Sequence, residues 1–259
     1  MPESPAVTSP IPPWQRRGYR PTGQDADVLL IVLSGDVPAE PRLPVDVPPG
    51  APVGALERQR HAGAEGQAWA NQWRTGSFRD LAATQLGELG ALDAAAGGYA
   101  VRVRLADPAD LSHLQLAWAT ATQLAAVATT VVFDVLAGIW HPGGAVAAQA
   151  PDRPFSVTRE ISVVYERQPS PSFGHPVHTR GMTKFARPDL IAGVSASQIP
   201  DTARILNHLA AMLADGAVLT PGQRLRFDGR RTLRVERYEP GDRIPDVHLA
   251  ADGLLLVDV

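Results

Sequence analysis

The stretch VLLIVLSGD, Val28–Asp36, joins an unbroken run of aliphatic residues to the turn sequence Ser-Gly-Asp. An apolar run this short, bounded by turn residues, is typical of a strand buried on both faces and is too short for a stable helix. We therefore predict a central strand at Val28–Leu33. The proline-dense segment after it, Pro38–Pro52, excludes regular structure because proline lacks the backbone N–H that helices and sheet interiors use.

Outward from this strand, the chain alternates between helical and extended patterns. We predict one helix over residues 55–73 and a second that opens at the capping-box-like Ser77–Asp80 and continues toward Gly97. The alternation in Tyr99–Leu105 predicts a half-buried strand with its arginines outward. Asp107, followed by proline, predicts the N-cap of a third helix.

The second half of the sequence is richer in strand patterns. A hairpin is predicted at residues 224–238, and parity decides its loop: only a three-residue loop puts Leu225 and Phe227 on the same face as Leu233. Ser195 is expected to cap the helix that follows it. The other elements predicted here are strands at Thr130–Val135, Glu160–Glu166, Pro176–Arg180, Leu190–Val194 and Leu254–Val257, and a helix at Pro200–Asp215.

These elements together predict an α+β fold: a mixed β-sheet with helices packed on its faces and a C-terminal β-hairpin. Residues 25–259 are expected to form a single α+β domain. Residues 1–24, rich in proline, serine and polar groups, are expected to form an extended N-terminal arm, with Trp14 and Tyr19 able to attach it to a surface groove.

Composition narrows the classes of function. The net charge is −3, with 44% hydrophobic and 20% charged residues, so no strong basic field favours nucleic acid or an anionic membrane surface. The chain has no cysteine, which excludes thiolate catalysis and cysteine-ligated metals. It shows neither a membrane-spanning run nor a signal peptide, so we expect a cytoplasmic protein. We expect no cofactor.

The chain's only lysine, Lys184, lies in the polar stretch HTRGMTKFARPDL, residues 178–190. A histidine, cationic side chains and a carboxylate that converge in one loop suit acid–base or anion-directed chemistry. The candidate ligand- or partner-binding residues are His175, His178, Arg180, Lys184, Arg187 and Asp189. The same residues also support a structural interpretation, which we favour. In it Arg180 and Asp189 pair across a turn, and Met182 and Phe185 fill the core beneath it.

Other chemical motifs point away from catalysis. His175 and His178, three apart on a strand, project to opposite faces and cannot jointly chelate an ion, so no metal is expected. Gly193–Ser197 lacks the last glycine of a nucleophile elbow, and the chain has no phosphate-binding glycine loop. Asp36 and Asp134 each follow or end a strand, and the sequence does not show whether they pair. Arg224, Arg226 and Arg234 share the outer face of the hairpin, where they suit a solvated face or an acidic partner.

The pattern Thr179-Arg180-Gly181-Met182-x-Lys184-Phe185-x-x-Pro188-Asp189-Leu190, preceded by VFD at residues 132–134 and followed by DGLLLV at residues 252–257, resembles uncharacterised bacterial families of unknown function with a T-R-G-[ML]-x-K-F-x-x-P-[DE]-L core. The resemblance spans residues 99–259. Some members of these families look like components of toxin–immunity neighbourhoods. The resemblance therefore implies a protein that binds and blocks, and it brings no catalytic residues with it.

Three functions are compatible with these observations. The first is a non-enzymatic bacterial binding protein with a protein partner, immunity-like or part of an assembly, in which self-association is also possible. The second is a hydrolase or transferase acting on an anionic small molecule, with His178 as base, Arg180 and Lys184 as anion clamps and Asp189 as orienting group. The third is a structural subunit whose N-terminal arm folds on contact.

Overall fold

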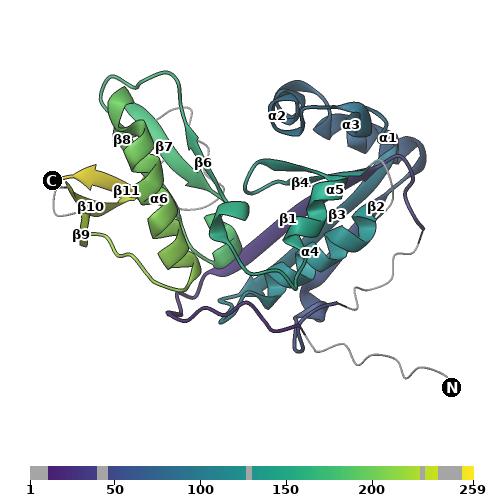
Figure 1. Cartoon of the computed structure of the whole chain (residues 1–259), viewed down its shortest axis with the longest axis horizontal. Helices are drawn as coiled ribbons and strands as arrows, with labels where there is room; N and C mark the ends of the chain where they lie inside the picture. Colours follow the sequence, from purple (N-terminus) through teal and green to yellow (C-terminus); the bar gives the residue numbers. More distant parts are fainter. Residues whose placement is uncertain (1–10, 40–45, 127–129, 228–230, 239–252) are drawn as a thin grey trace.

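A computed structural model describes residues 11–39, 46–126, 130–227, 231–238 and 253–259 of the chain. Helices and strands occur in similar amounts, which confirms the predicted α+β class. The strands are divided between two sheets rather than joined in one. In Figure 1 the first sheet and its helices form the right-hand part of the molecule, and the second sheet and its helix form the left-hand part.

The first sheet is antiparallel throughout and has the strand order β2-β3-β1-β4-β5. The predicted central strand is β1, which pairs with β3 on one side and β4 on the other. Its residues alternate between two cores, with Leu30 facing one and Ile31 the other. The strands are β1 (Asp25–Ser34), β2 (Leu56–His61), β3 (Gly97–Ala106), β4 (Thr130–Asp134) and β5 (Ile139–Pro142).

Helices cover both faces of this sheet, which is why β1 is apolar without interruption from Val28 to Leu33. The face carrying Ile31 and Phe133 packs against α1 (Gly63–Trp73), α2 (Gly76–Leu86) and α3 (Gly90–Asp93). The face carrying Leu30 packs against α4 (Ser112–Ala125), and the short α5 (Gly143–Val146) lies beside α4. The first half is therefore a three-layer sandwich (Figure 1).

The second sheet has the order β6-β7-β8-β11-β10-β9 and is mixed, because β8 and β11 run parallel while the other neighbours are antiparallel. One long helix, α6 (Ile199–Ala214), packs against β7 and β8. The strands are β6 (Ser162–Tyr165), β7 (His175–Arg180), β8 (Asp189–Val194), β9 (Arg224–Phe227), β10 (Arg231–Tyr238) and β11 (Gly253–Asp258).

Local predictions in the second half are confirmed. In the β9–β10 hairpin Leu225 pairs with Leu233 and Phe227 with Arg231, the register that a three-residue loop requires. The loop itself, residues 228–230, lies outside the described residues. Ser195 forms a capping box with Gln198, in the 3-10 turn η5 (Ala196–Gln198) that leads into α6.

Three local predictions in the first half are wrong. The predicted helix over 55–73 is strand β2 followed by α1, because pairing with β3 overrides the local helix pattern. No side chain caps the start of α2, and that helix ends at Gly87, whose positive φ stops it well before Gly97. Asp107 does not cap α4, which begins at Ser112; its carboxylate accepts the backbone N–H groups of residues 22 and 23 instead.

Residues 11–24 run beneath both sheets (dark purple in Figure 1) and are attached to them by two buried side chains. They have almost no regular structure, yet Trp14 and Arg16 are buried. The Trp14 indole donates to Arg153 O, and the Tyr19 hydroxyl donates to Asp107 O. Residues 1–10 of the predicted arm, and residues 40–45 of the proline-rich linker, lie outside the described residues.

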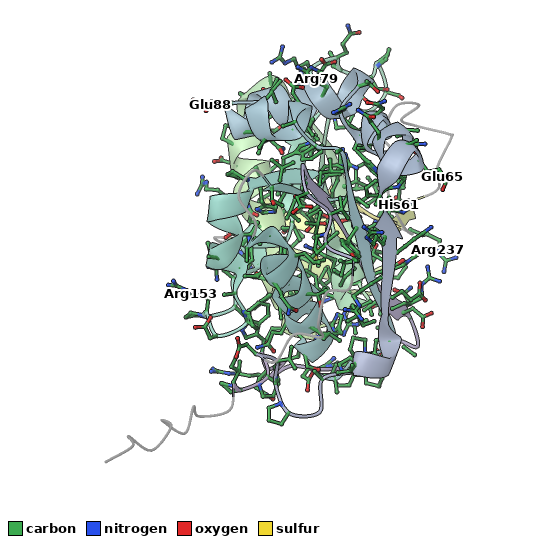
Figure 2. All side chains as sticks on the ribbon, turned by 90° about the vertical axis from the view of Figure 1, so that its right-hand side faces the viewer. His61, Glu65, Arg79, Glu88, Arg153 and Arg237 are labelled. Atoms are coloured by element: carbon green, nitrogen blue, oxygen red, sulfur yellow. The ribbon has the colours of Figure 1, made fainter. Side chains whose placement is uncertain are left out.

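A single cluster of buried apolar side chains joins the two halves. It includes Leu30 and Trp118 from the first half and Phe185, Leu206 and Leu254 from the second. Figure 2 shows the interior filled with side chains, while Glu65, Arg153 and Arg237 point outward from the margins. Among the described helices none is long and apolar enough to span a bilayer.

Candidate functional site at the junction of the two sheets

The connection from β7 to β8 carries most of the predicted site, and it leaves the second sheet to reach the first. Gly181 has φ +105° and turns the chain into the 3-10 helix η4 (Met182–Phe185), which contacts β1. Ala186, at φ +52°, returns the chain toward β8. Met182 and Phe185 are fully buried, so the predicted packing role of these two residues is present.

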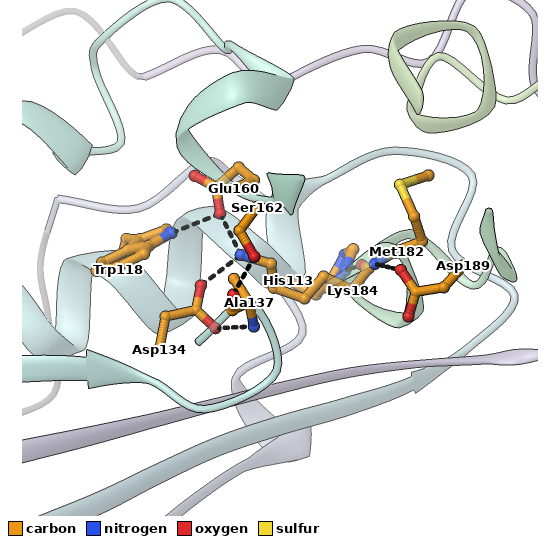
Figure 3. A network of polar contacts seen from close by, with 9 residues as sticks. All are labelled: His113, Trp118, Asp134, Ala137, Glu160, Ser162, Met182, Lys184 and Asp189. Atoms are coloured by element: carbon orange, nitrogen blue, oxygen red, sulfur yellow. Dashed lines mark hydrogen bonds and ion pairs between the residues drawn. The ribbon is translucent and has the colours of Figure 1, made fainter. Parts of the chain in front are cut away.

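Lys184 lies at the centre of a buried ion cluster, drawn in Figure 3. Its Nζ is 2.5 Å from Asp134 Oδ2 and 2.8 Å from Glu160 Oε2. All three side chains are at most 2% exposed. Asp134 ends β4 in the first half, and Glu160 follows the 3-10 turn η3 (Val157–Arg159) and precedes β6. One ammonium group therefore joins three segments that are far apart in the sequence.

Each carboxylate in this cluster has a second partner. Asp134 Oδ1 accepts a hydrogen bond from Ala137 N at 3.1 Å, in the turn between β4 and β5. Glu160 Oε2 accepts one from the Trp118 indole of α4 at 3.1 Å. Ser162 Oγ closes the network by donating to Ala137 O at 2.6 Å (Figure 3). Donors from helix, turn and ion pair compensate the desolvation of both carboxylates.

The charge state of Lys184 follows from its neighbours. Burial alone would lower its pKa, but the negative charges of Asp134 and Glu160 outweigh burial and raise the pKa above its usual value. Lys184 is therefore an ammonium at neutral pH. It has neither the free base form that a nucleophile or general base needs nor an exposed charge that a substrate anion would meet.

Two buried histidines border the cluster and are neutral. His113 Nε2 donates to Lys184 O at 2.8 Å, and burial lowers the pKa of His113 to about 4. The His141 ring packs edge-on to Trp118, and burial lowers its pKa to about 4 as well. Both imidazoles are therefore neutral at neutral pH, each with one N–H, so the charges of the cluster are those of Lys184 and the two carboxylates.

Asp189 stabilises its own turn. Its Oδ1 accepts hydrogen bonds from Thr179 Oγ1 at 2.8 Å and from Met182 N at 3.2 Å. Burial raises the pKa of Asp189 to about 6. The ion pair predicted between Arg180 and Asp189 is absent from the ion pairs of the described residues; the Arg180 guanidinium lies against Gly138 instead. The difference in burial explains the missing ion pair, because Asp189 is fully buried and Arg180 is not.

The two candidate histidines lie apart on β7. His175 Nδ1 is 3.1 Å from Glu166 O. His178 is buried, with Nδ1 3.2 Å from Thr179 O and Nε2 3.9 Å from a Glu166 carboxylate oxygen. Burial lowers the pKa of His178. Within the described ranges no group of three histidine or acidic side chains is arranged to hold a metal ion.

Arg187 points away from both the cluster and Asp189. Its guanidinium donates to four backbone carbonyls at 2.7–2.9 Å. Two follow the C-terminal end of α6, one lies in the N-terminal segment and one belongs to the preceding residue: Gly216 O, Ala217 O, Arg20 O and Ala186 O. The six candidate residues are thus brought into one region but not into one site. Lys184 faces the first sheet, Arg187 the N-terminal segment, and Asp189 its own turn.

The sequence did not identify the partners of Lys184. From the sequence, Asp134 is a carboxylate at a strand end whose pairing with Asp36 is left open, and Glu160 begins a predicted strand. One signal was present: an aspartate at the end of a largely apolar strand needs a cation or hydrogen-bond donors to compensate its carboxylate, but the pattern does not say which residues supply them. Trp118 and Arg16 carried no such signal.

Comparison with known proteins yields no match. No protein-family model, no curated protein and no solved structure is significantly similar to this chain. The resemblance carried by the T-R-G-M-x-K-F pattern stays a prediction. The roles of the residues described above are therefore argued from the geometry of this chain alone.

Proposed function

We propose that the protein is a non-enzymatic binding protein of the bacterial cytoplasm, immunity-like or a component of an assembly, that acts by contact with a protein partner. One observation carries the proposal. Lys184, one of the two cations expected to hold a substrate anion, and its neighbour Arg187 are engaged with Asp134, Glu160 and backbone carbonyls of their own chain. Their chemistry stabilises the junction of the two sheets, which leaves function to the exposed surfaces.

The alternative, an enzyme for an anionic small molecule, requires Lys184 and Arg180 to clamp the substrate together. In the folded chain that arrangement would require Lys184 to leave two carboxylates, both buried. Removing one partner of a buried ion cluster costs about 3–5 kcal/mol. A small anion would have to supply that free energy before any net binding, so the binding proposal is favoured.

The third possibility, a subunit whose N-terminal arm folds on contact, is less supported for residues 11–24. Trp14 and Arg16 already have partners within the same chain. Deleting this segment would therefore test folding rather than assembly.

The full chain, tagged and purified from its native cells, tests the proposal. We expect a protein partner to co-purify in stoichiometric amount. The parallel arm compares Arg180→Gln with Arg153→Gln, a matched change at an exposed arginine (Figure 2). A chain without partner whose turnover of an anionic substrate disappears in Arg180→Gln, with an unchanged unfolding midpoint, would overturn the proposal in favour of the enzyme.

A further inference from the structure

A groove of about 1090 Å³ lies between α6 and the β9–β10 hairpin. It is on the side of α6 that faces away from the first half of the molecule (Figure 1). Its apolar lining comes from Ile205 and Met212 on the helix and from Leu225 and Phe227 on β9. We call it the α6–β9 groove. None of the six candidate residues predicted from the sequence lines it.

The groove exists because α6 is a single helix and covers only part of the six-stranded sheet. α6 packs over β6, β7 and β8, but the same apolar face continues across the sheet to β9. At that end Leu225, Phe227 and Ile205 are only half-buried, and Met212 is 44% exposed. Apolar surface of this kind, continuous with a core, marks an interaction site more often than scattered exposed residues do.

The charges around the groove are mostly positive. Arg204, Arg224, Arg226 and Arg231 line it, and Asp201 is its only acidic lining residue. Asp201 pairs with Arg204, and Arg231 pairs with Asp258. The chain as a whole has a net charge of −3, so this surface is opposite in sign to the rest of the protein. Charge complementarity therefore favours an acidic partner.

The position of β9 at the end of the sheet indicates an extended partner segment. Along β9 the arginines at 224 and 226 are exposed, while Leu225 and Phe227 turn inward. β9 ends the sheet: among the described strands it pairs only with β10. An end strand can accept a further strand through its backbone N–H and C=O groups. The added strand would place alternate side chains beside Leu225 and Phe227 and the others beside the arginines.

We propose that the α6–β9 groove binds an extended acidic segment of a partner protein, in which apolar side chains alternate with Asp or Glu, as an added strand on β9. The inference rests on the proposed binding function and names the chemistry of the partner. The apolar side chains pack between Phe227 and Met212, and an acidic one meets Arg224.

The test uses the full chain and a fluorescent peptide of alternating glutamate and valine, followed by polarisation. We expect saturable binding that weakens with salt. Met212→Asp and Arg224→Glu each weaken it roughly tenfold or more. Arg237→Glu is the matched control: it reverses an exposed arginine on the neighbouring strand, outside the groove lining (Figure 2), and leaves binding unchanged. Unfolding midpoints confirm that the variants are folded, and Arg224→Gln replaces any variant that is not.

Three outcomes would overturn the inference. The first is equal binding of a lysine–valine peptide, which removes the charge argument. The second is equal binding of a peptide with the same composition but separate glutamate and valine blocks, which removes the added strand. The third is that the full chain forms a dimer and that Met212→Asp dissociates it. The groove would then be the contact between two copies of the chain.

A failure of this inference is distinguishable from a failure of the proposed function. If the partner purified from native cells is retained by the Met212→Asp/Arg224→Glu double variant, the groove is not the binding surface but the binding function stands. If the wild-type chain has no partner and binds none of the peptides, the binding function itself is wrong.

Discussion

Lys184 is the only lysine of the chain and is fully buried. An isolated buried ammonium would lose its proton, because a low-dielectric interior disfavours the charged form. Two carboxylates within 2.8 Å reverse that preference. The residue is thereby an internal cross-link between the two halves, and its stability contribution depends on both carboxylates being present.

Replacing this lysine tests the cross-link. Lys184→Met keeps most of the length of the side chain but leaves Asp134 and Glu160 without a cation, so we expect a loss of about 3–5 kcal/mol in the free energy of unfolding. Urea denaturation at pH 7 measures it. Arg204→Met, which removes an exposed ion pair with Asp201, should change the free energy by less than about 1 kcal/mol. Equal losses in the two variants would contradict a buried role for Lys184.

The burial of Asp189 can be tested through the dependence of stability on pH. Its pKa rises from 3.8 to about 6 in the fold because burial disfavours the charged form. Below pH 3.8 the carboxyl is protonated in both states, and between 3.8 and about 6 only the unfolded state ionises. This group therefore contributes stability at low pH that is lost as pH rises through about 6.

The Asp189→Asn substitution removes the loss of stability that accompanies ionisation of Asp189. The asparagine Oδ1 can still accept the Thr179 and Met182 hydrogen bonds, and its amide does not titrate. We expect the stability of the variant relative to the wild type to increase by about 3 kcal/mol between pH 4 and pH 7. Urea denaturation of both proteins at unit pH intervals measures this difference, in which the contributions of the histidines cancel. A difference independent of pH would show that Asp189 is ionised in the fold.

The connection between β7 and β8 is the element that places Lys184. It leaves the sheet at Gly181 and returns at Ala186, both with positive φ. Only glycine adopts φ +105° without steric cost. A Cβ at Gly181 would lie 2.9 Å from Glu160 O, so the backbone beside the ion cluster also depends on this glycine.

Gly181→Ala and Gly222→Ala separate these two effects. Gly222 has φ +89° but open space around it, so its alanine variant measures the strain of a positive φ, about 1–2 kcal/mol. Gly181→Ala should lose more, because Glu160 must also move. Thermal unfolding of the two variants side by side gives the comparison. If Gly181→Ala is no less stable than Gly222→Ala, contact with Glu160 is not what requires glycine.

At the scale of the whole molecule, Arg16 links the N-terminal segment to both halves. Its guanidinium donates to Pro108 O at 2.7 Å before α4, and to Phe185 O and Ala214 O at 3.0 Å in the second half. Burial lowers its pKa to about 10, which leaves it charged at neutral pH. Because the apolar cluster and these hydrogen bonds are shared by the two halves, we expect the halves to unfold as one cooperative unit.

Arg16→Met should therefore destabilise the protein far more than Arg17→Met, whose side chain is exposed. We expect a loss of about 3 kcal/mol or more for Arg16, because three buried carbonyls lose their donor, and less than about 0.5 kcal/mol for Arg17. Calorimetry of both variants measures the loss. Two separate transitions in the wild type, or equal effects of the two variants, would mean that the halves fold independently.

The sequence by itself determined the features that depend on residues close together in the chain. The apolar run of β1, the helical spacing of α6, the cap at Ser195 and the parity of the β9–β10 hairpin all follow from short-range sequence patterns. The same rules failed at β2, whose polar sequence becomes a strand only because β3 lies beside it.

Only the tertiary structure decided what the polar residues do. Lys184 is 50 residues from Asp134 and 24 from Glu160, and Arg16 is 169 residues from Phe185. Charge, size and spacing identify such side chains as able to bind an anion, but whether the anion is a ligand or a carboxylate of the same chain depends on which distant segments pack together. That packing minimises buried unpaired charge over the whole molecule, a sum that no local pattern contains.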